Sequence, residues 1–435
     1  MKYCRRPTSV RNIYFILNIS LFCIIGLASC SKSDHAVGLT APTLAITPGT
    51  SISIPYNSAA SFSWTTNGTG VTVNGVAYQG ASFTSPLLQT NSIYSITSYS
   101  SNYANDRLST TTQVTVSVGL NPNTADVYVA GNEKNGTVYV AKYWKNGTEV
   151  LLSDGTKNTL ATSIFVSGND VYVSGYEFNG TINVAKYWKN GIPVNLTSGL
   201  NEAKSFSIFV SENDVYVAGY EYYNGHPAAK YWKNGIPVNL TPGIRPSGAY
   251  SISMSGNDIY VAGYDVGQSP DDIATYWKNG SAVNLTSGIT PYGFANCILA
   301  SGKDIYVAGY ELIGSLSVAK YWKNGTAVYL TNTTNSSEAT GISISGTDVY
   351  TCGYEETASG VIIKYWKNGI AIDLNNGALY AGTGLMSVFG SDVYVAGYEY
   401  NGTVNVAKYW KNGTSVNLTN GTKPAAARGI FVVQH

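Results

Sequence analysis

Acidic side chains and lysines recur at fixed spacing through most of this chain. An acid stands seven residues after the Asp of each segment of the "DVYVAG" type. These acids are Glu133, Glu177, Glu221, Asp265, Glu311, Glu355 and Glu399. The lysines that follow them are Lys142, Lys186, Lys230, Lys320, Lys364 and Lys408, and Thr275 takes that place in the fourth repeat. The acids could bind a cation together, pair with the lysines, or reach solvent separately.

Few other residues offer catalytic chemistry. After residue 29 the histidines are His35, His226 and His435, and we find no metal-ligand cluster, nucleophile elbow or phosphate loop. The pairs Asp271–Asp272 and Glu355–Glu356 are interpreted as solvated loop charges. Two carboxylates could still act on a glycosidic bond from opposite sides of a ring. We expect no cofactor and no metal, and the sequence gives little support for an enzyme.

A repeat of 44 or 45 residues positions these side chains. The segment "YWKNG" occurs seven times, and its Trp stands at 144, 188, 232, 277, 322, 366 and 410. One unit contains four strand-like segments, at residues 163–167, 170–177, 182–188 and 192–197. Asn-Gly is the strongest short signal for a hairpin, because both central residues of a type I′ turn need positive φ. The repeated "KNG" is therefore predicted to turn the chain from the third strand to the fourth.

The strand register decides how the repeated charges can pair. A turn centred on Asn179-Gly180 places Tyr172 opposite Tyr187 and Asp170 opposite Lys189. In that register the repeated acid and lysine share a face but lie roughly 13 Å apart. We therefore expect these acids and lysines to pair between adjacent repeats, and the Asp and Lys of the strand ends to pair on one rim.

The two ends of the repeat region complement each other. The first repeat begins at its second strand, and the segment "GIFVV", residues 429–433, matches the missing first strand. The last strand is thus predicted to complete the first sheet, which removes an exposed sheet edge. Seven repeats with one split unit resemble a seven-bladed β-propeller over residues 125–435, with the Trp and Tyr side chains packed between blades. The alternative, a sugar-stacking role for these aromatic residues, stays open.

Function is expected where the repeats differ. The connections from the fourth strand of one unit to the first strand of the next differ most. In propellers these loops share a face with the turns between the second and third strands. The candidate ligand-binding residues on that face are Glu202, His226, Arg245, Tyr292, Glu338 and Tyr380.

The N-terminal sequence predicts that the protein is attached to a membrane. Lys2, Arg5, Arg6 and Arg11 precede an apolar run of about 16 residues, too short for a comfortable span. The run ends in "LASC", which resembles the lipobox of bacterial lipoproteins. The resemblance implies a signal peptide over residues 1–29, lipidation of Cys30 and a tether over residues 30–40. It also implies an outer-membrane location, on the cell surface or the periplasmic face, in a Bacteroidetes-type bacterium.

Residues 41–119 are predicted to form a separate small β-sandwich. Short strand-like segments rich in Ser and Thr fill this stretch, and Val114, Val116 and Val118 alternate with polar residues. The segment resembles bacterial immunoglobulin-like domains, with Trp64 as a core aromatic. Residues 119–124 are expected to be the linker, and the propeller domain is assigned to residues 120–435.

Charge and cysteine content restrict the partners. Without the signal the chain carries 22 basic and 25 acidic residues, and so lacks the basic field that nucleic-acid binding needs. Cys297 and Cys352 stand where sister repeats carry small residues, and we expect them to be buried. We expect a monomer.

The sequence therefore favours an all-β, lipid-anchored envelope protein that binds a carbohydrate or a protein. A polysaccharide hydrolase or lyase on the same scaffold is the alternative, and a purely structural scaffold is the third.

Overall fold

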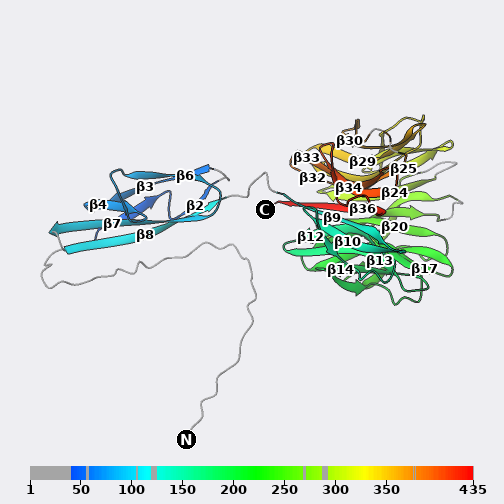
Figure 1. Ribbon diagram of the computed structural model, residues 1–435, viewed down its shortest axis with the longest axis horizontal. Coiled ribbons are helices and arrows are strands. Elements are labelled where there is room, and N and C mark those ends of the chain that lie inside the picture. Colours follow the sequence, from blue (N-terminus) through cyan, green and yellow to red (C-terminus); the bar gives the residue numbers. More distant parts are fainter. Residues whose placement is uncertain are drawn as a thin grey trace, which may run out of the picture. The chain divides into compact units, whose positions relative to one another are not determined.

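The computed structural model describes residues 41–54, 58–103, 106–118, 125–267, 271–286, 292–375, 377 and 379–434 (Figure 1). Every regular element in these ranges is a β-strand. The chain divides into two compact units, residues 1–123 and 124–435. The predicted signal peptide, Cys30, the tether and the linker lie outside the described residues.

The first unit contains two sheets that enclose one core. Their facing side chains bury Phe62, Trp64, Ile96, Val114 and Val116. Trp64 is 5% exposed, as expected of a core aromatic. One sheet has the order β1 (Leu44–Thr47), β3 (Ser58–Thr66) and β6 (Ser82–Leu88). The other has the order β2 (Ser51–Ile54), β8 (Asp106–Val118), β7 (Ser92–Tyr103), β4 (Gly70–Val73) and β5 (Val76–Tyr78).

The strands of the second unit form seven four-stranded antiparallel sheets in the described residues. Sheet 1 has the order β11 (Thr148–Leu151), β10 (Val138–Lys145), β9 (Ala125–Asn135) and β36 (Ala425–Gln434). Sheet 2 contains β12 (Thr159–Ser167), β13 (Asp170–Phe178), β14 (Asn183–Lys189) and β15 (Ile192–Asn195). Sheet 3 contains β16 (Ala203–Ser211), β17 (Asp214–Tyr223), β18 (His226–Lys233) and β19 (Ile236–Asn239). Sheet 4 contains β20 (Ser247–Ser255), β21 (Asp258–Asp265), β22 (Ile273–Lys278) and β23 (Ser281–Asn284).

The remaining three sheets repeat this order. Sheet 5 contains β24 (Gly293–Ser301), β25 (Asp304–Ile313), β26 (Leu316–Lys323) and β27 (Thr326–Tyr329). Sheet 6 contains β28 (Ser337–Ser345), β29 (Asp348–Thr357), β30 (Gly360–Lys367) and β31 (Ile370–Asp373). Sheet 7 contains β32 (Ala381–Phe389), β33 (Asp392–Tyr400), β34 (Asn405–Lys411) and β35 (Thr414–Asn417).

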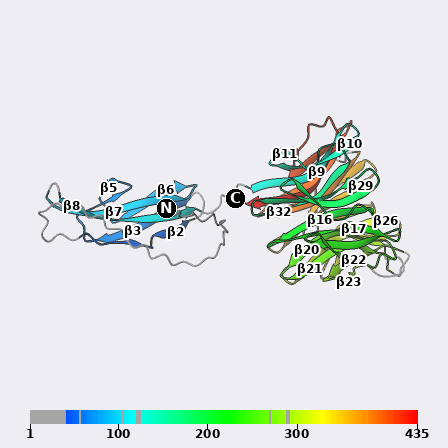
Figure 2. The same ribbon diagram turned by 90° about the horizontal axis from the view of Figure 1, so that it is seen from below.

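The sheets pack in a closed order, each against the next. The edge strands β12, β16, β20, β24, β28, β32 and β36 each contact their counterparts in both neighbouring sheets, and β36 contacts both β32 and β12. β36 pairs with β9, with Ile430 opposite Val129 and Phe431 opposite Tyr128; β36 is red in Figures 1 and 2. The predicted completion of the first sheet by the last strand is confirmed. The unit is an all-β, propeller-like ring.

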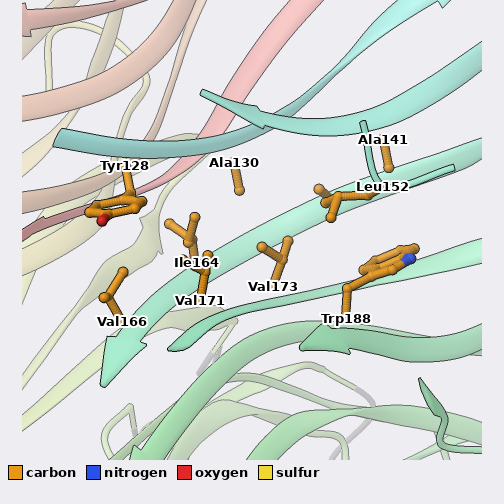
Figure 3. Close-up of a cluster of buried hydrophobic side chains, with 10 residues drawn as sticks. Tyr128, Ala130, Ala141, Leu152, Ile164, Val166, Val171, Val173 and Trp188 are labelled. Carbon is orange, nitrogen blue, oxygen red and sulfur yellow. The ribbon is translucent and has the colours of Figure 1, made fainter. Parts of the chain in front are cut away.

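Large apolar side chains fill the space between consecutive sheets. Figure 3 shows Tyr128 and Ala130 of sheet 1 facing Ile164, Val173 and Trp188 of sheet 2. The seven repeated Trp side chains are at most 1% exposed, which confirms their predicted packing. Burying a side chain of this size contributes on the order of 3 kcal/mol each. Cys297 and Cys352 are buried as expected.

The prediction of a two-residue turn at Asn179-Gly180, between the second and third strands of sheet 2, is wrong. Tyr172 lies opposite Lys189, and Ser174 lies opposite Tyr187. The connection has four residues, because Asn179 N donates to Ile182 O at 2.9 Å and Asn179 Oδ1 accepts from Thr181 N. The "KNG" turn does have the predicted two-residue form, with φ of 52° at Asn190 and 82° at Gly191.

This register also corrects the pairing of the repeated charges. Lys186 lies two residues from Val184, the partner of Glu177, so the two charged groups share a face of one sheet. Lys186 Nζ lies 3.0 Å from Glu177 Oε2. The ion pairs expected between adjacent repeats therefore form within single sheets, in every sheet but sheet 4, where Thr275 replaces the lysine. The others are Lys142–Glu133, Lys230–Glu221, Lys320–Glu311, Lys364–Glu355 and Lys408–Glu399.

The pairs predicted on the rim are present. Lys145 Nζ lies 2.6 Å from Asp126 Oδ2, and each of the other six sheets has the equivalent contact. The lysine members are about half exposed, so these pairs stabilise the fold little. The Asn of each "KNG" turn also donates to the rim Asp, as Asn190 Nδ2 does to Asp170 Oδ1 at 2.8 Å.

Candidate functional site

In each sheet the strand nearest the axis, such as β12, is called the inner strand, and its partner, such as β13, is called the second strand. The inner strands begin and the second strands end at the same end of the ring. Because β12 and its six counterparts contact one another, these strands line the axis. Near its start each inner strand has a register irregularity, and a bulge of this kind re-aims a side chain. We call this end of the ring the mouth. The residues at the irregularities are Thr162, Phe206, Tyr250, Asn296, Thr340, Gly384 with Leu385, and Arg428.

A continuous run of aromatic rings crosses three neighbouring sheets at the mouth. The centroid of Phe206 lies 5.3 Å from that of Tyr250, and Tyr250 lies 6.2 Å from Phe294. Phe294 also contacts Tyr310 at 5.5 Å and Tyr292 at 5.6 Å. These rings are half-buried, in contrast to the buried Trp side chains of the sheet interfaces. Part of each ring surface in the run is therefore accessible.

The second strands of sheets 2 to 7 each carry a tyrosine at the same position of the repeat, near this end of the ring. These tyrosines are Tyr176, Tyr220, Tyr264, Tyr310, Tyr354 and Tyr398, and Asn132 takes their place in sheet 1. Burial and the nearby Asp272 raise the pKa of Tyr264 to about 12. Burial likewise raises the pKa of Tyr220, Tyr310 and Tyr354. Their hydroxyls stay protonated near neutral pH and can donate hydrogen bonds.

Two carboxyl groups lie among these aromatic residues. Burial raises the pKa of Glu338, and a hydrogen bond from Tyr354 opposes that rise. Burial raises the pKa of Asp272 in the same way, against a hydrogen bond from Tyr292. In the described part of the chain no ion pair joins either carboxyl group to a lysine or arginine, and their named neighbours are tyrosines and acids. Both carboxyl groups are therefore available to accept or donate a hydrogen bond to a ligand.

The opposite side of the mouth is lined by small residues. Gly382, Gly384 and Ala426 stand there in place of bulky side chains. A Cβ added at Gly384 would lie 2.0 Å from Arg428 O, so a side chain cannot replace this glycine without movement. A hollow of about 220 Å³ lies beside Arg428. The mouth is thus filled by rings on one side and hollow on the other.

Three of the predicted site residues occupy one position of the repeat. Glu202, Tyr292 and Tyr380 each precede an inner strand, and each backbone oxygen accepts from a residue of the second strand, as Tyr292 O does from Leu312 N. Tyr292 packs on Phe294, and its charge interactions include Asp272 and Glu338. Glu202 acts on the pKa of Tyr220. The structure therefore brings Glu202, Tyr292 and Glu338 to the mouth.

The other three predicted residues lie apart from this cluster. Tyr380 packs on Tyr400 at 5.6 Å and is 60% exposed. His226 begins β18 opposite Tyr223, at an exposed hairpin. Arg245 is exposed in the connection before β20. The predicted lipidation site, Cys30, lies outside the described residues.

Sequence reasoning missed Arg428, Asp272 and the aromatic run. Asp272 was interpreted as a solvated loop charge, but it is half-buried and bonded to Tyr292. Arg428 and the aromatic residues of the inner strands could have been found from the sequence. The residue after the second small residue of each inner strand varies between repeats, from Thr162 through Phe206 and Tyr250 to Arg428. Variation within a repeated strand, rather than in the loops alone, marks the mouth.

The described residues contain no group of three or more His, Cys, Asp or Glu side chains placed to hold a metal ion. Six of the seven repeated acids pair with lysines, and Asp265 accepts a hydrogen bond from Gly267 N. Searching the described ranges for a helix long and apolar enough to cross a bilayer also finds none.

Comparisons with known proteins add little to this picture. No family model matches, and no curated protein matches. Among solved structures, the β-propeller domain of the Trilobed protease from Pyrococcus furiosus covers 76% of this chain and 96% of its own, at 10% identity and a TM-score of 0.40. A puromycin hydrolase covers 69% of this chain at 10% identity and a TM-score of 0.47. TolB from Acinetobacter baumannii covers 57% of this chain and 64% of its own, at 12% identity and a TM-score of 0.40.

This chain spans about half of the puromycin hydrolase, 52% of its length. Likenesses at this level carry no argument about activity. The architecture of this chain rests on its own strand pairing.

Proposed function

We propose that this chain is a non-catalytic saccharide-binding protein, and that the mouth of the ring is its binding site. The run of half-buried rings through Phe206, Tyr250 and Phe294 carries the proposal. Apolar C–H faces of sugar rings pack on aromatic faces, and their hydroxyls need polar partners at the edge of the same surface. Tyrosine hydroxyls, Asp272 and Glu338 supply those partners.

The finer architecture belongs to the same proposal. The seven sheets are the blades of a seven-bladed β-propeller closed by β36, and the first unit is an immunoglobulin-like sandwich. Cys30 carries the lipid that holds the protein to the bacterial outer membrane. A Cys30→Ser variant should move the protein from the membrane fraction to the soluble fraction, and an unchanged distribution would refute the anchor.

Hydrolysis of a polysaccharide is the second candidate, and one observation favours it. Glu338 has a raised pKa, as a general acid of a glycosidase requires. Such an enzyme also needs a second carboxylate that flanks the same bond. Release of reducing ends from a bound polysaccharide, abolished by Glu338→Gln, would establish this alternative over binding alone.

A binding titration tests the saccharide proposal. The full-length chain, purified in detergent, is titrated with neutral and acidic oligosaccharides by calorimetry. The variant Phe206→Ala/Tyr250→Ala/Phe294→Ala should weaken binding at least about tenfold, because each aromatic ring in contact with a sugar contributes on the order of 1 kcal/mol. Tyr223→Ala is the matched control, since it removes a 59% exposed ring outside the run.

The single variant Phe206→Ala keeps the test valid if the triple variant fails to fold. It should weaken binding severalfold while its thermal unfolding stays cooperative. Equal affinities for wild type, the Phe206 variant and the Tyr223 control would overturn the proposal.

A further inference from the structure

The hollow beside Arg428 lies at the seam where the last strand completes the ring. Its lining includes Asn132 of β9, Tyr398 of β33, Asn405 of β34 and Arg428 of β36. Leu160, from sheet 2, closes one side. The hollow therefore depends on three sheets and on the closure of sheet 1 by β36.

Arg428 is the charged group of this hollow. Its Nε donates to Asn132 Oδ1 at 3.2 Å, and Asn132 is only 2% exposed, so the guanidinium is held from one side. No carboxylate lies within 4.0 Å of Arg428 among the described residues, whereas the repeated lysines of the third strands are paired with acids. The Arg428 side chain is exposed at the mouth. Its outer nitrogen atoms are thus placed to bind a ligand.

The hydrogen-bond donors around this hollow fit an anionic group better than the apolar face of a sugar ring. A guanidinium binds a carboxylate or a sulfate through two parallel hydrogen bonds, and amide and hydroxyl donors can complete the shell. Asn405 and Tyr398 bring an amide and a hydroxyl to the same hollow. The small side chains of Ala425 and Ala426 line the same hollow and leave the space that such a group needs.

We propose that the Arg428 hollow is a subsite for an anionic group on a saccharide, either the carboxylate of a uronic acid or a sulfate ester. This inference rests on the proposed saccharide binding at the mouth. The aromatic run then holds the sugar rings, and Arg428 selects chains that carry negative charge. Saccharides without an anionic group should bind through the aromatic run alone, with lower affinity.

Matched ligands test the subsite. Oligogalacturonate is compared with its methyl ester, and dextran sulfate with dextran, so that each pair differs in charge and shares its sugar backbone. The full-length chain should bind at least one charged member about tenfold more tightly than its neutral partner. The pair that shows the difference identifies the source of the anionic group.

Variants then assign that preference to Arg428. Arg428→Gln should abolish the charge preference, and Arg428→Lys should restore part of it. Lys423→Gln is the matched control, because it removes one exposed cation from the same segment outside the hollow. Thermal unfolding checks that the Arg428 variants stay folded.

The outcomes separate this inference from the proposed function. Binding of neutral saccharides with no charge preference, or a preference that Arg428→Gln leaves intact, would overturn the subsite and keep the function. Absence of binding to all four ligands, charged and neutral, would overturn the subsite together with the proposed saccharide binding.

Discussion

Val129 and Ile430 lie opposite each other in adjacent strands, although they come from the two ends of the ring-forming segment. Val129 is 1% exposed and Ile430 is 4% exposed, in one apolar cluster with Trp144. The pairing makes the first sheet a composite of both ends of the repeat region. It also places Arg428 beside Asn132, so the closure of the fold and the lining of the mouth have the same origin.

Introducing a charge at this seam should unfold the ring. Ile430→Asp leaves an unpaired carboxylate in an apolar cluster, which should cost about 3–5 kcal/mol of unfolding free energy. Urea denaturation followed by Trp fluorescence measures the change. Gln434→Asp, at the exposed end of β36, is the control and should change stability by less than about 0.5 kcal/mol. Equal stability of both variants would mean that β36 does not hold the ring together.

Removing one partner of a buried ion pair should lower the free energy of unfolding much more than replacing both partners with apolar residues. Lys320 is 1% exposed at its side chain and pairs with Glu311. Lys320→Met leaves Glu311 without its partner and should cost about 3 kcal/mol, whereas Lys320→Met/Glu311→Leu should recover most of the loss. Chemical denaturation of both variants provides the comparison. A double variant as unstable as the single one would show that the pair itself stabilises the sheet.

The hairpin asparagines should contribute through hydrogen bonds as well as conformation. Asn190 Oδ1 accepts from Val171 N at 2.8 Å, and its φ is 52°. Asn190→Ala loses these bonds and adopts an unfavourable φ, which should cost about 1–2 kcal/mol. Asn190→Gly tolerates the positive φ but lacks the side-chain hydrogen bonds, so its thermal unfolding temperature should lie between those of wild type and Asn190→Ala. If the glycine variant matches wild type, the side-chain bonds contribute nothing.

Glu338 should make stability depend on pH with a definite sign. Burial raises its pKa in the folded state, so folding favours the protonated form, and stability falls as pH rises above the unfolded pKa of about 4.3. Glu338→Gln, which mimics the protonated form, should unfold at a higher temperature than wild type at pH 7. Below about pH 4 the difference should vanish. The exposed Glu212→Gln is the control, and a Glu338 variant less stable at pH 7 would contradict the assignment.

The repeat, the Asn-Gly turns and the closing strand could be predicted because each has a local signature that recurs in every unit. The register between second and third strands could not, because Asn179-Gly180 has the letters of a two-residue turn but belongs to a four-residue connection. The predicted register differs from the observed one by two residues, and it places Lys186 too far from Glu177 to pair with it. The prediction of ion pairs between adjacent repeats was therefore wrong.

The mouth was only partly predictable for a different reason. Its loop members, such as Tyr292, stand out because the loops vary. Phe206, Tyr250 and Arg428 lie inside strands that otherwise repeat, and each stands at a register irregularity of its strand. In the sequence these positions are marked only by their variation between repeats, and that variation does not show that the strand is bulged there.

Crosslinking across the seam tests the closed ring most directly, because the mouth exists only if β36 joins β9. Val127 and Val432 lie opposite each other in the pairing, so Val127→Cys/Val432→Cys should form an intramolecular disulfide on oxidation. Mass spectrometry of the digested monomer would detect the linked peptides. The control Val127→Cys/Val416→Cys joins strands of different sheets that do not pair, and should stay unlinked. A seam variant that yields no linked peptide, or links only between molecules, would contradict the account.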